Sequence, residues 1–252
     1  MGVSSILPIV FTLVFSVALP VGLMLYLRKK GGKWGAFLIG ALTFVVSTMI
    51  LESILHNLLS RTALWAVLRG SVWLYALYGG LAAGIFEETG RFLAFRLLMK
   101  DEREPVAALG CGVGHGGAEA ILLVGLTMVN DLVLAAMVSA GGTTDPIVLE
   151  AAEQLAATPA GMFLWAAFER FGAIILHLAL SVLVFAAVKE PGKKWLFPTA
   201  ILIHAALDFI AVVANAYLPM AAMEIIVLIF AVMAALFARK VYRALSATDQ
   251  EN

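Results

Sequence analysis

Long apolar stretches alternate with short charged segments along the whole chain. Apolar runs of about 18 residues or more are typical of helices that span a lipid bilayer. Seven runs of this kind cover residues 4–27, 34–55, 71–95, 105–140, 158–188, 195–215 and 220–238. The fourth run is so long that we expect it to be broken or tilted. The pattern predicts an all-α fold, a polytopic membrane bundle of about seven transmembrane helices.

Composition supports the same class of protein. Hydrophobic residues make up 62% of the 252 residues and charged residues only 13%, which is more apolar than a soluble core of this size requires. We therefore expect one integral membrane domain over residues 1–252. The net charge is zero, so nothing favours a nucleic-acid partner. The single cysteine, Cys111, excludes an intramolecular disulfide and is interpreted as a packing residue.

Basic residues concentrate in alternate loops. Thirteen lysines and arginines fall in one set of loops and only two in the other set. By the positive-inside rule, the N-terminus is expected outside and the C-terminus in the cytoplasm, in a bacterial or archaeal plasma membrane. Because no basic residue precedes the first run, we expect a retained helix and no cleaved signal peptide. Residues 141–158, which include no lysine or arginine, predict an exterior loop with a short amphipathic helix.

Two adjacent carboxylates, Glu87 and Glu88, lie inside the third apolar run, and Arg91 follows one turn later. Ionisable groups at such a depth are costly unless they are paired or hydrated, so they usually mark a functional site. At about 1.5 Å of rise per residue, Glu88 lies roughly 12 Å from the basic end of its helix. Three other helices bring histidines to a similar depth, roughly 14 to 17 Å from their basic ends. These histidines are His115, His177 and His204.

Polar residues within these runs recur at helical spacing. Pairs four residues apart share one face of a helix, and in lipid such a face must point into the bundle. The pairs are Glu87 with Arg91, His115 with Glu119, and His204 with Asp208. Five glycines lie between residues 110 and 117. They either let a neighbouring helix pack closely or loosen this helix so that a backbone can approach.

Four short motifs occur in order in the third to sixth apolar runs. They are EETGR at 87–91, GVGHGGAEA at 112–120, Glu169-Arg170 leading to His177, and HAALD at 204–208. Together they resemble the motifs of the YhfC family of intramembrane proteases, which is related to the PrsW and CAAX-protease (CPBP) groups. The resemblance covers about residues 71–215, the expected catalytic core, and the remaining runs contribute hydropathy alone.

The resemblance implies an intramembrane endopeptidase that hydrolyses a peptide bond in a membrane-embedded or membrane-associated substrate. One glutamate would activate water, with His115 or His177 positioning it, and the choice between Glu87 and Glu88 stays open. His204 would donate to the oxyanion. Asp208 stands where many relatives have asparagine, and we expect it to orient His204. The candidate catalytic residues are Glu87, Glu88, Arg91, His115, Glu119, His177, His204 and Asp208.

A zinc-dependent mechanism is the alternative to this metal-free one. Glutamate and histidine from several helices suit zinc, and the candidate ligands are Glu88, Glu119, His177 and His204. No HExxH motif occurs in the sequence, so we favour glutamate-activated water without a cofactor over the metalloprotease. The expected partners are the lipid bilayer and a peptide or transmembrane-helix substrate, and the oligomeric state is not predicted.

Two other function classes stay open. A proton-coupled transporter would also place acidic residues and histidines at mid-depth, although the repeated halves common in transporters are absent from the sequence. The other class is a non-catalytic membrane binding protein, in which we would expect the candidate catalytic residues to be lost. Glu52, His56 and Asp131 lie near predicted helix ends and are interpreted as structural. Glu169 and Arg170 are expected to pair with each other or with neighbouring helices.

Overall fold

The computed structural model describes residues 3–142 and 144–250, which form an α-helical bundle without strands. The longer elements are α1 (Val3–Lys29), α2 (Trp34–Phe44), α5 (Val72–Leu93), α6 (Val106–Glu119), α7 (Leu126–Ser139), α9 (Ala160–Lys189), α10 (Leu196–Tyr217) and α11 (Met220–Gln250). The shorter ones are α3 (Ser53–Leu59), α4 (Ala63–Arg69), α8 (Pro146–Ala157) and the 3₁₀ turn η4 (Pro191–Lys193). Three π-helical segments extend α2, α5 and α6: η1 (Val45–Glu52), η2 (Ala94–Leu98) and η3 (Ala120–Gly125).

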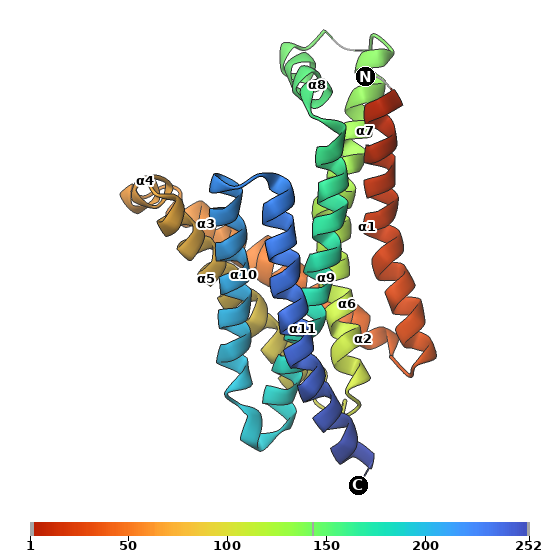
Figure 1. Cartoon of the computed structure of the whole chain (residues 1–252), viewed down its shortest axis with the longest axis vertical. Helices are drawn as coiled ribbons and strands as arrows, with labels where there is room; N and C mark the ends of the chain where they lie inside the picture. Colours follow the sequence, from red (N-terminus) through yellow and green to blue (C-terminus); the bar gives the residue numbers. More distant parts are fainter. Residues whose placement is uncertain (1–2, 143, 251–252) are drawn as a thin grey trace.

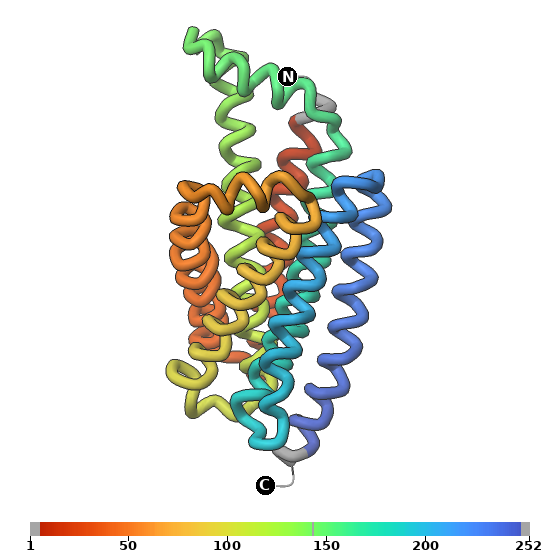
Figure 2. The backbone as a smooth tube through the Cα atoms, turned by 90° about the vertical axis from the view of Figure 1, so that its left-hand side faces the viewer, coloured from red at the N-terminus to blue at the C-terminus, as the bar shows by residue number. Residues whose placement is uncertain are grey.

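These elements make seven helical passes, as the apolar pattern predicts. The passes are α1, α2–η1–α3, α5–η2, α6–η3–α7, α9, α10 and α11. The start of α1 and the end of α11 lie at opposite ends of the bundle, as an odd number of passes requires (Figures 1 and 2). Six of the passes are long and apolar enough to cross a membrane. The α5 pass is less apolar because it carries Glu87, Glu88 and Arg91.

The fourth predicted run is one continuous helical pass, and the expected break is absent. The widened π-helical turn η3 begins directly after Glu119 and joins α6 to α7. The short helix expected between residues 141 and 158 is α8, at the same end of the bundle as the start of α1 (Figure 1). Asp145 begins α8 by accepting a hydrogen bond from the backbone N–H of Ile147 at 2.9 Å. This is the usual role of an aspartate before the first turn of a helix.

Apolar side chains fill the bundle toward the basic ends of α5, α6, α9 and α10. Phe95, Leu180, Leu183, Phe185 and Leu196 are at most 1% exposed and belong to one core cluster. The Phe95 and Phe185 rings meet edge to face with centroids 5.3 Å apart, a favourable arrangement for aromatic rings. We call these five residues the basic-end cluster. The polar residues of the motifs lie on the other side of this cluster, toward the middle of the bundle.

The glycines of α6 allow two neighbouring helices to approach closely. A Cβ atom on Gly114 would lie 2.0 Å from the carbonyl oxygen of Phe37 on α2. A Cβ atom on Gly112 would lie 2.8 Å from the carbonyl oxygen of His177 on α9, and one on Gly116 would lie 3.0 Å from the His177 ring. Because α6 stays α-helical through Glu119, the close-packing alternative holds. This approach brings His115 and His177 together.

Gly114→Ala is therefore expected to lower the free energy of unfolding by about 3 kcal/mol, because the added methyl group has no space beside the α2 backbone. Gly79→Ala on α5 is the matched control, since a Cβ atom there meets nothing within 4 Å. Denaturation by SDS in mixed micelles, followed by circular dichroism, measures the free energy of unfolding of both variants. Equal stability of the two variants would contradict the packing of α6 against α2.

Candidate active site

Glu88 and Arg91 form a buried ion pair on the inward face of α5. Both side chains are 0% exposed, and Arg91 Nη1 donates to both Glu88 oxygens at 2.5 Å. The spacing of three residues places them on neighbouring turns of the same helix face. His204 on α10 adds a third contact, with its Nδ1 2.8 Å from Glu88 Oε1. A buried carboxylate needs such partners, because an unpaired charge there is strongly destabilising.

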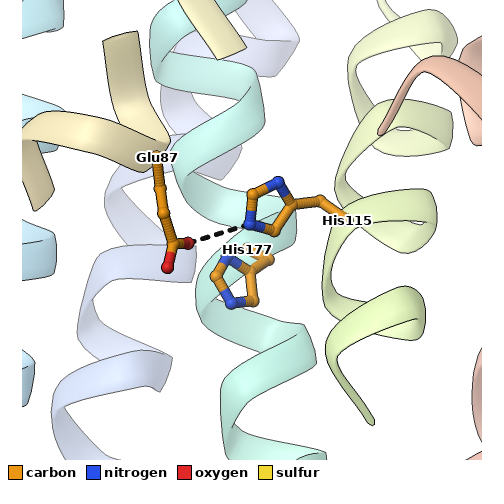
Figure 3. A group of neighbouring side chains, drawn as sticks. All are labelled: Glu87, His115 and His177. Carbon is orange, nitrogen blue, oxygen red and sulfur yellow. Dashed lines mark hydrogen bonds and ion pairs between the residues drawn. The ribbon is translucent and has the colours of Figure 1, made fainter. Parts of the chain in front are cut away.

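Glu87 has different surroundings from its neighbour. Its Oε2 lies 2.8 Å from Nε2 of His115 on α6 (Figure 3) and 3.8 Å from Nε2 of His204. Both of these contacts use the same oxygen, and neither involves an arginine. The structure thus distinguishes the adjacent glutamates: Glu88 is held by Arg91 and His204, whereas Glu87 faces histidine nitrogens.

His177 on α9 links the arginine of α5 to a second ion pair. Arg91 Nη2 lies 3.1 Å from His177 Nδ1, and His177 Nε2 lies 2.6 Å from Glu119 Oε2. Arg170 Nη1 donates to Glu119 Oε1 at 2.7 Å, and Arg170 Nε donates to Glu169 at 2.6 Å. Glu119 is therefore occupied by His177 and Arg170. His115, four residues before Glu119 on α6, faces Glu87 instead.

Asp208 lies near the exposed side of this network. Its Oδ2 is 3.7 Å from His204 Nε2, and the same nitrogen is 3.8 Å from Glu87. Both distances are too long for a direct hydrogen bond and suit a bridging water. The expectation that Asp208 orients His204 stays a prediction. Glu88 contacts the other ring nitrogen of His204 at 2.8 Å.

Thr43 on α2 is a site residue that the sequence motifs do not include. Its hydroxyl donates to the Gly40 carbonyl at 2.6 Å, so it accepts from His115 Nδ1 at 3.1 Å. The proton of neutral His115 is then on Nδ1, and its Nε2 lone pair points at the carboxylate of Glu87. Two acceptors 2.8 Å apart must share a proton or a cation. Threonine is common in apolar helices, so no motif marks Thr43.

Two of the imidazoles around Glu87, those of His115 and His177, have the outer hydrogen-bond partners found in metal sites. Thr43 and Glu119 accept the outward N–H groups of His115 and His177, as outer partners of metal ligands do. One ligand atom from each of Glu87, His115 and His177 lies within 4.8 Å of the other two (Figure 3). For ligation, His177 Nδ1 must exchange its hydrogen bond from Arg91 for the metal. With that exchange, the donor set fits zinc, with three protein ligands and one open position.

This cluster differs from the metal ligands expected from the sequence. Of the expected set, Glu88, Glu119, His177 and His204, only His177 belongs to it. The other three have different partners: Glu88 contacts Arg91 and His204, and Glu119 contacts Arg170 and His177. Depth in the membrane does not give the rotation of each helix about its axis, and this rotation decides which polar residues meet.

Comparison with known proteins gives two matches. The sequence model of a family described as YhfC intramembrane metalloprotease matches residues 15–231. A protein of Bacillus subtilis (strain 168), described as "Uncharacterized membrane protein YhfC", is 36% identical over 232 residues, which cover 85% of this chain and 88% of the relative. No solved structure matches the chain. The family match extends beyond residues 71–215 and includes Thr43 on α2.

Proposed function

Because the chain belongs to the YhfC family of intramembrane metalloproteases, we propose that it is a metal-dependent endopeptidase that hydrolyses a peptide bond within the membrane. The observation that carries the proposal is the buried cluster of Glu87, His115 and His177. His204 lies beside it, across a gap that suits one water molecule. Membrane-embedded groups of this kind are retained for function and not for packing.

In this mechanism Glu87, His115 and His177 would hold the metal ion. A zinc ion would polarise the scissile carbonyl and make its bound water acidic. His204 Nε2, which faces Glu87 across the gap, takes a proton from the attacking water. The same nitrogen then gives this proton to the leaving amine as the C–N bond breaks. The products are the new carboxyl terminus and the new amino terminus of the substrate.

Glu88, Arg91 and Asp208 support His204 in this scheme. Glu88 accepts from His204 Nδ1 at 2.8 Å and so directs Nε2 toward the water, as the aspartate of a catalytic triad does for its histidine. Arg91 fixes the Glu88 carboxylate by donating to both of its oxygens. Asp208, 3.7 Å from His204 Nε2, helps to hold the water. The functional unit includes α2 as well as residues 71–215, because Thr43 orients His115.

The metal-free mechanism differs in the role of Glu87. Its carboxylate would take the proton directly from water, and the short contact with His115 would hold one shared proton. We favour the metal because the Nε2 lone pair of His115 faces Glu87, and because His115 and His177 both have outward acceptors. The two mechanisms make opposite predictions about chelation.

The test measures metal content and cleavage together. Protein purified without added chelator is expected to contain about one zinc ion per chain. In proteoliposomes, it should cut transmembrane peptides drawn from its native membrane, and 1,10-phenanthroline should abolish the cut until zinc is restored. Full activity of metal-free protein would contradict the metal mechanism and support the mechanism in which Glu87 activates water. Absence of any cleavage by zinc-loaded protein would contradict the proposed function.

A further inference from the structure

Polar residues outside the motifs form a stripe along one face of α2, η1 and α3. Thr43, Ser47 and Glu52 are 7%, 2% and 7% exposed, and His56 continues the row. The spacing is four, five and four residues. A π-helix has more residues per turn than an α-helix, so the five-residue step across η1 keeps the row on one face. We call Thr43, Ser47, Glu52 and His56 the polar stripe.

The polar stripe connects the site to the end of the bundle that holds α3 and α4. At its inner end, Thr43 contacts His115 at 3.1 Å, and Ser47 donates to the Thr43 carbonyl at 2.5 Å. At its outer end, Glu52 Oε1 lies 3.1 Å from His56 Nε2. His56 Nδ1 in turn lies 2.5 Å from the Tyr78 hydroxyl on α5. Apolar, exposed residues such as Met49, Ile50 and Ile54 lie on another face of this pass.

Two buried oxygens on η1 lack a protein partner. Among the described residues, Glu52 Oε2 and Thr48 Oγ1 are buried and make no hydrogen bond. Buried polar atoms are almost always satisfied by protein or by water, and a carboxylate oxygen in a membrane is especially costly to leave dry. The Glu52 carboxylate also interacts electrostatically with Glu87, His204 and Asp208. The unpartnered oxygens therefore indicate water between the stripe and the site.

Asp208 gives an independent indication on the opposite helix. Its side chain is 32% exposed, although it lies about 14 Å from the end of α10 at Tyr217. A carboxylate at that depth is exposed to water and not to lipid. On the other side of the site, the basic-end cluster of Phe95, Leu180, Leu183, Phe185 and Leu196 blocks access with buried apolar side chains.

We propose that water reaches the site from the α3–α4 end of the bundle, between the polar stripe and Asp208, with Glu52 as the residue that hydrates this route. The inference rests on the proposed function for its purpose, because hydrolysis in a membrane needs a supply of water. By the orientation expected from the basic loops, the route opens on the outer side of the membrane. This assigns a role to Glu52 and His56, which the sequence alone suggested to be structural.

Cysteine accessibility tests the route without requiring proteolysis. Cys111→Ala removes the only cysteine of the sequence, and Glu52→Cys and His56→Cys then introduce single thiols on the stripe. Ile54→Cys, on the lipid-exposed face of the same helix, and Leu183→Cys, in the basic-end cluster, are the controls. Membrane-impermeant methanethiosulfonates are added to right-side-out or inside-out vesicles. A thiol reacts as its thiolate, which forms in water and not in lipid.

We expect both stripe thiols to react at least about tenfold faster than either control, and only from the side of the α3–α4 end. Reaction from the other side alone, or equal rates at positions 52 and 54, would overturn the route. Ser47→Cys, a nearly isosteric change, keeps the test valid if Glu52→Cys fails to fold. In the Ser47→Cys variant, adding Glu52→Leu should slow the reaction of position 47 with both a cationic and an anionic methanethiosulfonate. Adding Glu52→Gln instead should slow neither reaction much. Slowing of the cationic reagent alone would indicate only a charge effect and contradict a hydrated route.

The result separates the route from the proposed function. Labelling on the stripe with no cleavage by zinc-loaded protein would support the water route and contradict the proposed protease function. Cleavage without labelling from the α3–α4 end would support the protease function and contradict the water route.

Discussion

Replacing Glu87 by glutamine is expected to lower peptide cleavage by at least about 10³-fold, because the amide cannot serve as an anionic ligand or accept a proton from water. The loss is expected with or without a metal, since Glu87 lies 2.8 Å from His115 and 3.8 Å from His204. Proteomic comparison of membranes that contain wild-type or Glu87→Gln protein measures it. Peptides cut only in the wild-type membranes also identify the substrate.

The matched control is Glu224→Gln on α11. Glu224 is 4% exposed, so this variant also changes a buried glutamate in the membrane, but α11 contributes no residue to the described network around Glu87. Cleavage by Glu224→Gln should remain within a few-fold of wild type. Metal content should fall in Glu87→Gln alone. Undiminished cleavage by Glu87→Gln would exclude Glu87 from the reaction in either mechanism.

The sequence predicted the passes and the depth of the polar groups because both depend on hydropathy and helical rise. Seven passes follow the seven apolar runs. Residues placed at one depth, such as Glu88, His115 and His204, converge in the structure on neighbouring helices. Helical spacing of four residues also predicted which side chains share a face, as with His204 and Asp208.

The pairing of these groups could not be predicted from depth alone. A side chain at the correct level can point toward any of several neighbours, and the choice depends on helix rotation and close packing. Gly112 and Gly116 let α6 and α9 approach until His115 and His177 become neighbours. That approach put Glu87 and the two histidines together and left Glu88 with Arg91. The ligand set expected from the sequence differs from this cluster for this reason.

The three π-helical segments were also outside the reach of pattern analysis. Most of their residues are apolar, as in any other membrane helix, and no proline marks η1 or η3. Yet η1 determines that Ser47 and Glu52, five residues apart, lie on one face. A regular α-helix would rotate Glu52 away from the stripe by more than a quarter of a turn. The sequence therefore suggested a structural role for Glu52 at a helix end.

Replacing Arg91 by methionine is expected to destabilise the protein by about 3–5 kcal/mol, because it leaves the fully buried Glu88 carboxylate without its cation. Arg91 is 0% exposed and makes two 2.5 Å contacts to Glu88 and one of 3.1 Å to His177. Methionine fills much of the same space, so the loss measures the missing charge and hydrogen bonds. SDS denaturation in mixed micelles gives the free energy of unfolding.

A double-mutant cycle distinguishes the ion pair from simple packing. Glu88→Gln combined with Arg91→Met removes both charges, and we expect it to be more stable than Arg91→Met alone, with a coupling of about 2–3 kcal/mol between the positions. Arg96→Met, at an exposed position little more than one turn further along the chain, should change stability by less than about 0.5 kcal/mol. If Arg91→Met were as stable as Arg96→Met, the buried pair would not be what holds Glu88 beside His204. The orientation of His204 would then need another source, and the assignment of Glu88 as its partner would fail.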